Sequence, residues 1–198
     1  MRQGEAELAF VGPAPYVQIM DKSHNIQLLA RFKMLHEIDD RMVIICKSHA
    51  PFQRLADLAG STFAFGDRQS FGSHFMPRWL LAKQGITLPS LTAYAFVRSH
   101  DNVILSVLHG DFAAGGVRLD VFNRYKERPL RILAGPFVIP PHAIVCLSTL
   151  PPSLKDKLRH SLLVLNDPKI LHTINPLMEK FAPVSDRDFN LARKVMEK

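Results

Sequence analysis

The stretch FAFGDRQSFGSHF, residues 63–75, indicates both the fold class and a candidate site. A strand that runs into a Ser/Gly-rich turn at a helix start presents backbone N–H groups and hydroxyls at the positive end of a helix dipole, where anions bind. Ser70 and Ser73 would donate hydroxyl hydrogen bonds, and Gly72 would allow close backbone approach. His74 either adds a donor or packs. Taken alone, the segment also fits an ordinary capped helix.

The same arrangement recurs at SHDN, residues 99–102, where Ser99 and His100 stand between an expected strand and an expected helix. Two such helix starts in consecutive strand-helix units would lie at the carboxyl ends of parallel strands, where ligands of open α/β sheets bind. A shared oxyanion pocket is the prediction. The alternative for His100 is an exposed first residue of an amphipathic helix.

Alternating apolar runs and turn signals predict an α/β fold with a parallel sheet covered by helices. Strands are expected at residues 7–12, 26–32, 41–47, 62–65, 93–97, 112–117 and 130–135, with another before residue 148. Helices are expected from Pro13 and at residues 53–58, 99–110 and 119–127, besides the one after the Ser/Gly turn. The tail is predicted to be helical throughout, in three segments that begin near residues 151, 167 and 185.

Length, composition and net charge limit the classes of function that suit this chain. With 198 residues, 47% of them hydrophobic, the chain can bury a real core, as one large domain or two small lobes. Its net charge of +7 favours an anionic partner. Because the basic residues are scattered and no aromatic ladder interleaves them, nucleic acid is the weakest of the anionic candidates.

Several chemistries find no support in the sequence. Cys46 and Cys146 end apolar runs and are interpreted as small buried hydrophobes, a disulfide between them being the less favoured alternative. No cysteine or histidine pattern indicates a metal, no cofactor motif occurs, and no hydrolase, nucleotide-binding or metalloprotease motif supports catalysis. No stretch approaches the roughly 18 apolar residues of a membrane span, and no signal peptide is visible.

Five motifs, modest singly but specific in this order, carry a resemblance: GEAELAFVGPAPYV, DLAGSTFAFGDRQSFGSHFMPRWLLAKQGI, SHDNVILSVLHGDFAAG, PLRILAGPFVIPPHAIV and LPPSLKDKLRHSLL. From Gly4 to about Leu165 the chain closely resembles the phosphonate/phosphite/phosphate substrate-binding proteins of ABC transporters. The resemblance implies a type-II periplasmic binding protein fold, in which two α/β lobes flank a ligand cleft that closes by hinge motion.

The resemblance also implies the domain organisation. Lobe one would comprise residues 1–52 and 136–198, and lobe two residues 53–135, with crossings near Lys47 and Pro140. Family members have a strand, a helix and a second strand before the equivalent of Gly4, so lobe one is expected to be incomplete. An incomplete sheet leaves an edge open, through which the chain could form a homo-oligomer.

Site residues are carried over from the same resemblance. The ligand-binding residues are expected to be Ser70, Phe71, Gly72, Ser73, His100, Asp120, His142 and Tyr16. The family's usual turn is Ser-Thr-Ser-Gly, and Phe71 and Gly72 depart from it. His142 stands where a second acid is common, and a tyrosine often found before the hinge strand falls near Asp40. Since an ammonium group needs carboxylates, these departures favour a less cationic or more apolar phosphonate, or another oxyanion.

The function expected from this resemblance is that of a solute-binding protein, not an enzyme, which delivers a small phosphonate-like oxyanion to an ABC permease in the membrane. No cofactor, no metal and no nucleic acid are expected. Localisation would be periplasmic or extracytoplasmic, given a signal on the full precursor. The main alternative is a ligand-sensing input module of a regulatory protein. A third class, an enzyme acting on phosphate esters, predicts turnover and a metal requirement.

Overall fold

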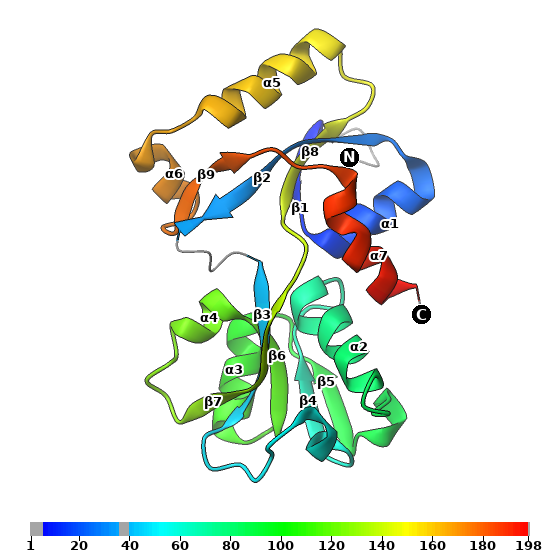
Figure 1. The fold of residues 1–198 in the computed structure, drawn as a ribbon, viewed down its shortest axis with the longest axis vertical. Helices are drawn as coiled ribbons and strands as arrows, with labels where there is room; N and C mark the ends of the chain where they lie inside the picture. Colours follow the sequence, from blue (N-terminus) through cyan, green and yellow to red (C-terminus); the bar gives the residue numbers. More distant parts are fainter. Residues whose placement is uncertain (1–5, 36–39, 198) are drawn as a thin grey trace. The chain divides into compact units, whose positions relative to one another are not determined.

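The computed structural model describes residues 6–35 and 40–197, which divide into two compact units (Figure 1). The first unit combines the residues before Asp40 with Pro140–Glu197, and the second is Asp40–Ile139. The boundaries expected from the sequence placed residues 40–52 and 136–139 in lobe one instead. They differ because the strand that begins at Arg41 is hydrogen-bonded to two strands of the second unit.

The second unit is built on a five-stranded sheet in the order β5-β4-β6-β3-β7. Its strands are β3 (Arg41–Lys47), β4 (Thr62–Phe65), β5 (Ala93–Phe96), β6 (Ala114–Arg118) and β7 (Leu130–Val138). Its helices are α2 (Met76–Ala82), α3 (His100–His109) and α4 (Leu119–Asn123), with a π-helical turn at Phe71–Phe75 and 3-10 turns at Leu55–Leu58 and Leu88–Ser90. Ser99 caps α3 and Gly110 ends it in the left-handed region, as predicted.

The prediction of a parallel sheet is right for only part of this unit. β4 runs parallel to both β5 and β6, whereas β3 is antiparallel to β6 and to β7. Hydrophobic periodicity reports which residues are buried but says nothing of strand direction, so the sequence did not reveal the two antiparallel strands. The parallel portion is the part that matters for the site, because β5, β4 and β6 end at the same sheet edge.

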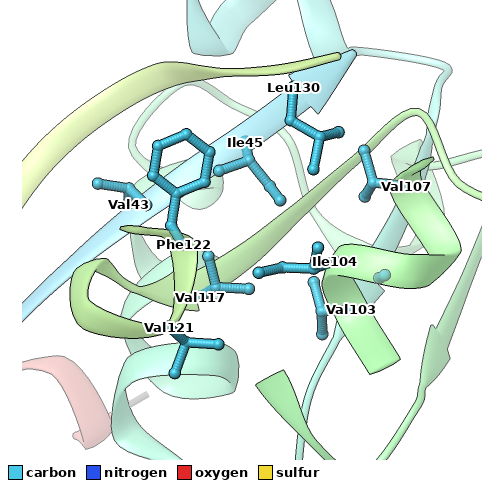
Figure 2. Packing of buried hydrophobic residues seen from close by; sticks show 10 residues of the cluster. Val43, Ile45, Val103, Ile104, Val107, Val117, Val121, Phe122 and Leu130 are labelled. Carbon is cyan, nitrogen blue, oxygen red and sulfur yellow. The ribbon is translucent and has the colours of Figure 1, made fainter. Parts of the chain in front are cut away.

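The core of the second unit lies between the sheet and α3 and α4 (Figure 2). Val43 and Ile45 on β3 and Val117 on β6 point toward the helices, where Val103 and Ile104 of α3 meet them with no exposed surface. Val107, Val121, Phe122 and Leu130 complete the cluster. Burial of β-branched side chains on both elements fixes α3 on the sheet, and with it the residue at the start of α3.

The first unit is built on a four-stranded sheet in the order β1-β8-β2-β9, with antiparallel pairing throughout. The strands are β1 (Leu8–Val11), β2 (Ile26–Met34), β8 (Ala143–Leu147) and β9 (Met178–Ala182). The helices are α1 (Pro13–Ser23), α5 (Pro152–Val164), α6 (Pro168–Ile174) and α7 (Asn190–Met196), the last after a 3-10 turn at Asp186–Phe189. A buried cluster joins Ala30, Met34, Leu171, Met178 and Phe181.

The prediction of a wholly helical tail is wrong at β9. Asp167 caps α6 and Pro168 is its first residue, as expected, but the helix ends before Asn175. Because Asn175 precedes a proline, its backbone is extended, with φ −153° and ψ 126°. The chain then pairs with the edge of β2, from Met34 opposite Met178 to Arg31 opposite Ala182. A partner strand distant in sequence thus decides this segment's conformation.

Candidate functional site

The Ser/Gly turn follows β4 and begins a helical segment at Ser70. Ser70 has an extended backbone and its Oγ accepts the N–H of Ser73 at 3.1 Å, which is the geometry of an N-cap. The helix starts as a π-helical turn, in which the N–H groups of His74 and Phe75 both donate to the Ser70 carbonyl. The N–H groups of Phe71 and Gly72 precede these bonds, so the helix itself offers them no acceptor.

Ser73 carries an unused hydroxyl at this helix start. Its side chain is 1% exposed, and Oγ has no hydrogen-bond partner among the described residues. The Gly66 N–H donates to the Ser73 carbonyl at 3.0 Å, which brings the two residues into direct contact. A buried hydroxyl without a partner is destabilising, so a ligand oxygen that reached it would satisfy a donor that the fold leaves unmet.

His74 packs instead of presenting a donor. Its Nδ1 lies 2.7 Å from the Arg68 carbonyl, which can only accept, so Nδ1 carries the proton and Nε2 is an acceptor. The ring contacts Phe65, Phe75 and Phe96. Burial lowers the pKa of His74 and keeps the ring neutral. Of the two roles considered for this residue, the geometry favours packing.

His100 is the first residue of α3 and is oriented by β6. Its Nδ1 accepts the backbone N–H of Arg118 at 3.3 Å, so the neutral ring carries its proton on Nε2. Burial, together with the positive charge of Arg118, lowers the pKa of His100 to about 4. His100 is therefore a neutral hydrogen-bond donor at ordinary pH. Ser99, whose Oγ accepts the Asn102 N–H at 3.1 Å, fixes the helix start that positions it.

Arg118 and Asp120 follow at the end of β6 and the start of α4. Arg118 Nε donates to Asp120 Oδ1 at 2.9 Å, and the side chains are 17% and 19% exposed. Burial alone would raise the pKa of Asp120, but the Arg118 charge and hydrogen bond outweigh burial and lower it. A Cβ placed on Gly72 would lie 3.7 Å from Arg118 Cγ, so this side chain adjoins the turn.

The second unit thus brings together most of the residues predicted from the sequence. Ser70–Ser73 follow β4, His100 follows β5, and Arg118 ends β6, three strands that run parallel side by side. Arg118 was missed by the sequence reasoning. The sequence did carry a signal for Arg118. This residue directly follows the third strand of the unit and stands two residues before Asp120, and the ends of the two preceding strands were already candidate sites.

Tyr16 and His142 lie in the first unit. Tyr16 is 2% exposed, its hydroxyl donates to Asp186 Oδ1 at 2.8 Å, and its ring packs on Phe189. Burial, followed by the hydrogen bond to Asp186, raises the pKa of Tyr16. His142 stacks on Phe10, with ring centroids 5.2 Å apart. Contact of either residue with a ligand stays a prediction from the resemblance.

Within residues 6–35 and 40–197, no group of three or more His, Cys, Asp or Glu side chains could hold a metal ion. In the same ranges, no helix is long and apolar enough to cross a membrane. Cys46 and Cys146 are buried and unpaired with each other, as free thiols on β3 and β8.

Comparison with known sequences gives one family match. The profile of a family described as "ABC transporter, phosphonate, periplasmic substrate-binding protein" matches residues 1–189. This range contains the candidate site and both compact units except for the end of the tail.

Comparison with solved structures gives similar folds throughout. PhnD1 of Prochlorococcus marinus, in complex with methylphosphonate, has a TM-score of 0.83 at 19% identity, covering 99% of this chain and 79% of that one. A binding-protein component of an ABC phosphonate transporter from Pseudomonas aeruginosa has a TM-score of 0.80 at 19% identity, covering 98% and 68%. A Xanthomonas citri protein bound to ATP has a TM-score of 0.79 at 18% identity, covering 99% and 77%. At these identities the likeness shows a shared fold.

Proposed function

With its residues 1–189 matching that profile, the chain belongs to the phosphonate ABC transporter periplasmic substrate-binding proteins, and we propose that it binds a phosphonate or related phosphorus oxyanion at the Ser70–Ser73 turn. The resemblance seen in the sequence and the type-II periplasmic binding protein fold are both confirmed. Proteins of this family are solute-binding components of transporters and not enzymes, and they are periplasmic.

The observation that carries the proposal is the convergence of three strand ends on one edge of the sheet. The turn supplies the N–H groups of Phe71 and Gly72 and the hydroxyls of two serines, and α3 supplies the Nε2–H of His100. Arg118, paired with Asp120, places its cationic side chain beside the turn. A tetrahedral oxyanion carries several acceptor oxygens and negative charge, which match this set of donors.

The partners follow from the same proposal. The ligand would be a small phosphorus oxyanion, and the bound form would deliver it to an ABC permease in the membrane. His142 and Tyr16 are the residues of the first unit that the resemblance assigns to the ligand, and Asp120 is assigned to it in the second.

We further propose that copies of this chain associate through the sheet of the first unit. β1 is an edge strand of the described sheet, and it exposes Leu8 by 44% and Phe10 by 52%. An apolar edge strand favours pairing with another strand. Sedimentation velocity tests this: a dimer that dissociates on Phe10→Lys supports the proposal, and a monomer at high concentration contradicts it.

The binding proposal is tested by isothermal titration calorimetry with methylphosphonate, phosphite, phosphate and sulfate. We expect one phosphorus oxyanion to bind selectively and Ser70→Ala to weaken it at least about tenfold, because one hydroxyl donor to a charged group contributes roughly 1.5–3 kcal/mol. No binding by any member of the panel to the folded wild-type protein would refute the proposal.

Ser185→Ala is the matched control. Ser185 also caps a helical turn, through a capping box with Asp188, but it lies in the first unit. Both substitutions remove a cap and should lower stability by about 1 kcal/mol. Only Ser70→Ala should change the affinity. An equal loss of affinity in both variants would assign the effect to stability and not to contact with the ligand.

A further inference from the structure

The ion pair between Arg118 and Asp120 changes what the site can recognise. Asp120 is the carboxylate that the resemblance assigns to a ligand's ammonium group. In this structure its Oδ1 accepts Arg118 Nε at 2.9 Å, and both side chains are largely buried. A carboxylate so paired has its charge compensated within the protein, and a cationic ligand group would have to displace the guanidinium.

The neighbouring acidic groups of the second unit are also engaged. Asp101, in the first turn of α3, accepts Arg124 Nη2 at 3.1 Å and the Tyr125 hydroxyl at 2.8 Å. Asp67, in the Ser/Gly turn, is exposed and accepts the Gln69 N–H at 2.7 Å. His100 is neutral. Arg68, the next residue of the same turn, offsets the charge of Asp67, and its guanidinium lies over the Phe96 ring. These charged groups therefore sum to no net negative charge that would attract an ammonium.

The position of Arg118 relative to the turn favours an anion instead. Its Cγ adjoins Gly72, and its backbone N–H holds His100 with the Nε2–H as donor. One residue thus places a cationic side chain beside the turn and orients a second donor. The pair with Asp120 is net neutral, but the side chain of its cationic member is the one that adjoins the turn. A nearer positive charge strengthens the binding of an anion and opposes an ammonium on the same ligand.

We propose that Arg118 is a specificity-determining residue, which makes this protein select phosphorus oxyanions that lack an ammonium group over aminoalkylphosphonates. This inference rests on the proposed function, because it concerns the same site. The preferred class comprises alkylphosphonates, phosphite and small phosphate esters. Asp120 acts with Arg118 as its positioning partner and does not bind the ligand's amine.

The test compares methylphosphonate with 2-aminoethylphosphonate by calorimetry. The wild-type protein should bind methylphosphonate at least about tenfold more tightly. In Arg118→Gln, Asp120 becomes an uncompensated carboxylate, and the ratio of the two affinities should shift at least about tenfold toward 2-aminoethylphosphonate. Arg118→Lys keeps the charge and should keep the preference. An unchanged ratio in Arg118→Gln would overturn the inference.

A double variant distinguishes a change in ligand preference from a loss of folding, and the wild-type protein tests the proposed function itself. Because Arg118→Gln leaves a partly buried carboxylate unpaired and can unfold, the double variant Arg118→Gln/Asp120→Asn provides a neutral pair of similar shape. It should lose the wild-type preference without gaining one for the amine, and retention of the full wild-type preference would contradict the inference. If the wild-type protein bound neither phosphonate nor any other phosphorus oxyanion, the proposed function itself would fail.

Discussion

The Ser73 side chain occupies the space that Gly66 leaves empty. A Cβ on Gly66 would overlap Ser73 Oγ and stand 2.8 Å from Ser73 Cβ, and the Gly66 N–H donates to the Ser73 carbonyl at 3.0 Å. The last residue before the turn and the first turn of the helix are thus in direct contact. This contact sets how closely the donor-bearing turn follows the end of β4.

Gly66→Ala should destabilise the protein by about 1–3 kcal/mol, because the added methyl group overpacks a buried contact. Chemical denaturation measures the loss. Combining it with Ser73→Gly removes the overlapping atoms, so the double variant should lose less stability than the sum of the two single variants. If the stability losses of the two single variants added strictly in the double variant, the contact between these two residues would not be the cause of the destabilisation.

Ser73→Ala should leave the folded protein at least as stable as the wild type, because the deleted hydroxyl is buried without a partner. The same substitution should weaken phosphonate binding at least about tenfold if that hydroxyl donates to the ligand. Thermal melting with and without methylphosphonate gives both readouts. Ser106→Ala, on α3, is the control, since its Oγ donates to the Asn102 carbonyl. A Ser73→Ala protein with wild-type affinity would remove Ser73 from the site.

His100 should make stability decline as the solution becomes acidic. Its folded pKa of about 4 lies below the ordinary 6.5, so the unfolded chain takes up the proton first as pH falls. The stability that neutral His100 contributes is fully present above about pH 6.5 and declines as the pH falls toward 4. At about pH 4 the loss of unfolding free energy has reached about 3 kcal/mol.

The measurement is the difference in unfolding free energy between the wild type and His100→Asn, from pH 7 to pH 4. Asn offers an oxygen to the Arg118 N–H but does not titrate, and carboxylates titrate alike in both proteins. The difference should fall by roughly 3 kcal/mol across this range. A difference independent of pH would mean that His100 is not buried in the neutral form.

Tyr16→Phe should cost about 1–2 kcal/mol of stability, because the Tyr16 hydroxyl donates to Asp186 in a partly buried position and a charged acceptor loses a partner. Asp186 keeps its ion pair with Arg193 at 2.5 Å, which limits the loss. Tyr94→Phe, at a residue 43% exposed, should be neutral. Because the Tyr16 hydroxyl already donates to Asp186, we expect phosphonate affinity to stay within about twofold of wild type, against the ligand contact that the resemblance assigns to Tyr16. A large loss of affinity at unchanged stability would instead place Tyr16 in contact with the ligand.

Much of the fold could be predicted from the sequence, because the local signals for strands and helix caps agree with the tertiary packing. The strand from Thr62 to Phe65, the helix from Ser99 to Gly110 and the cap at Asp167 follow from apolar runs and capping chemistry within a few residues. The segment at β9 was wrongly predicted to be helical, because its strand forms only through pairing with β2, more than a hundred residues earlier in the chain. The direction of β3 relative to β6 was likewise hidden.

The sequence by itself determined the family, the α/β class and the turn at Ser70–Ser73, because ordered motifs and helix-start chemistry are local properties of the chain. The tertiary structure decided that His100 is buried and neutral, with its Nδ1 accepting the Arg118 N–H. It also decided that Asp120 is paired with the Arg118 side chain and that Tyr16 donates to Asp186. Charge state and hydrogen-bond partner depend on burial and on neighbours distant in the sequence, and only the folded chain brings these together.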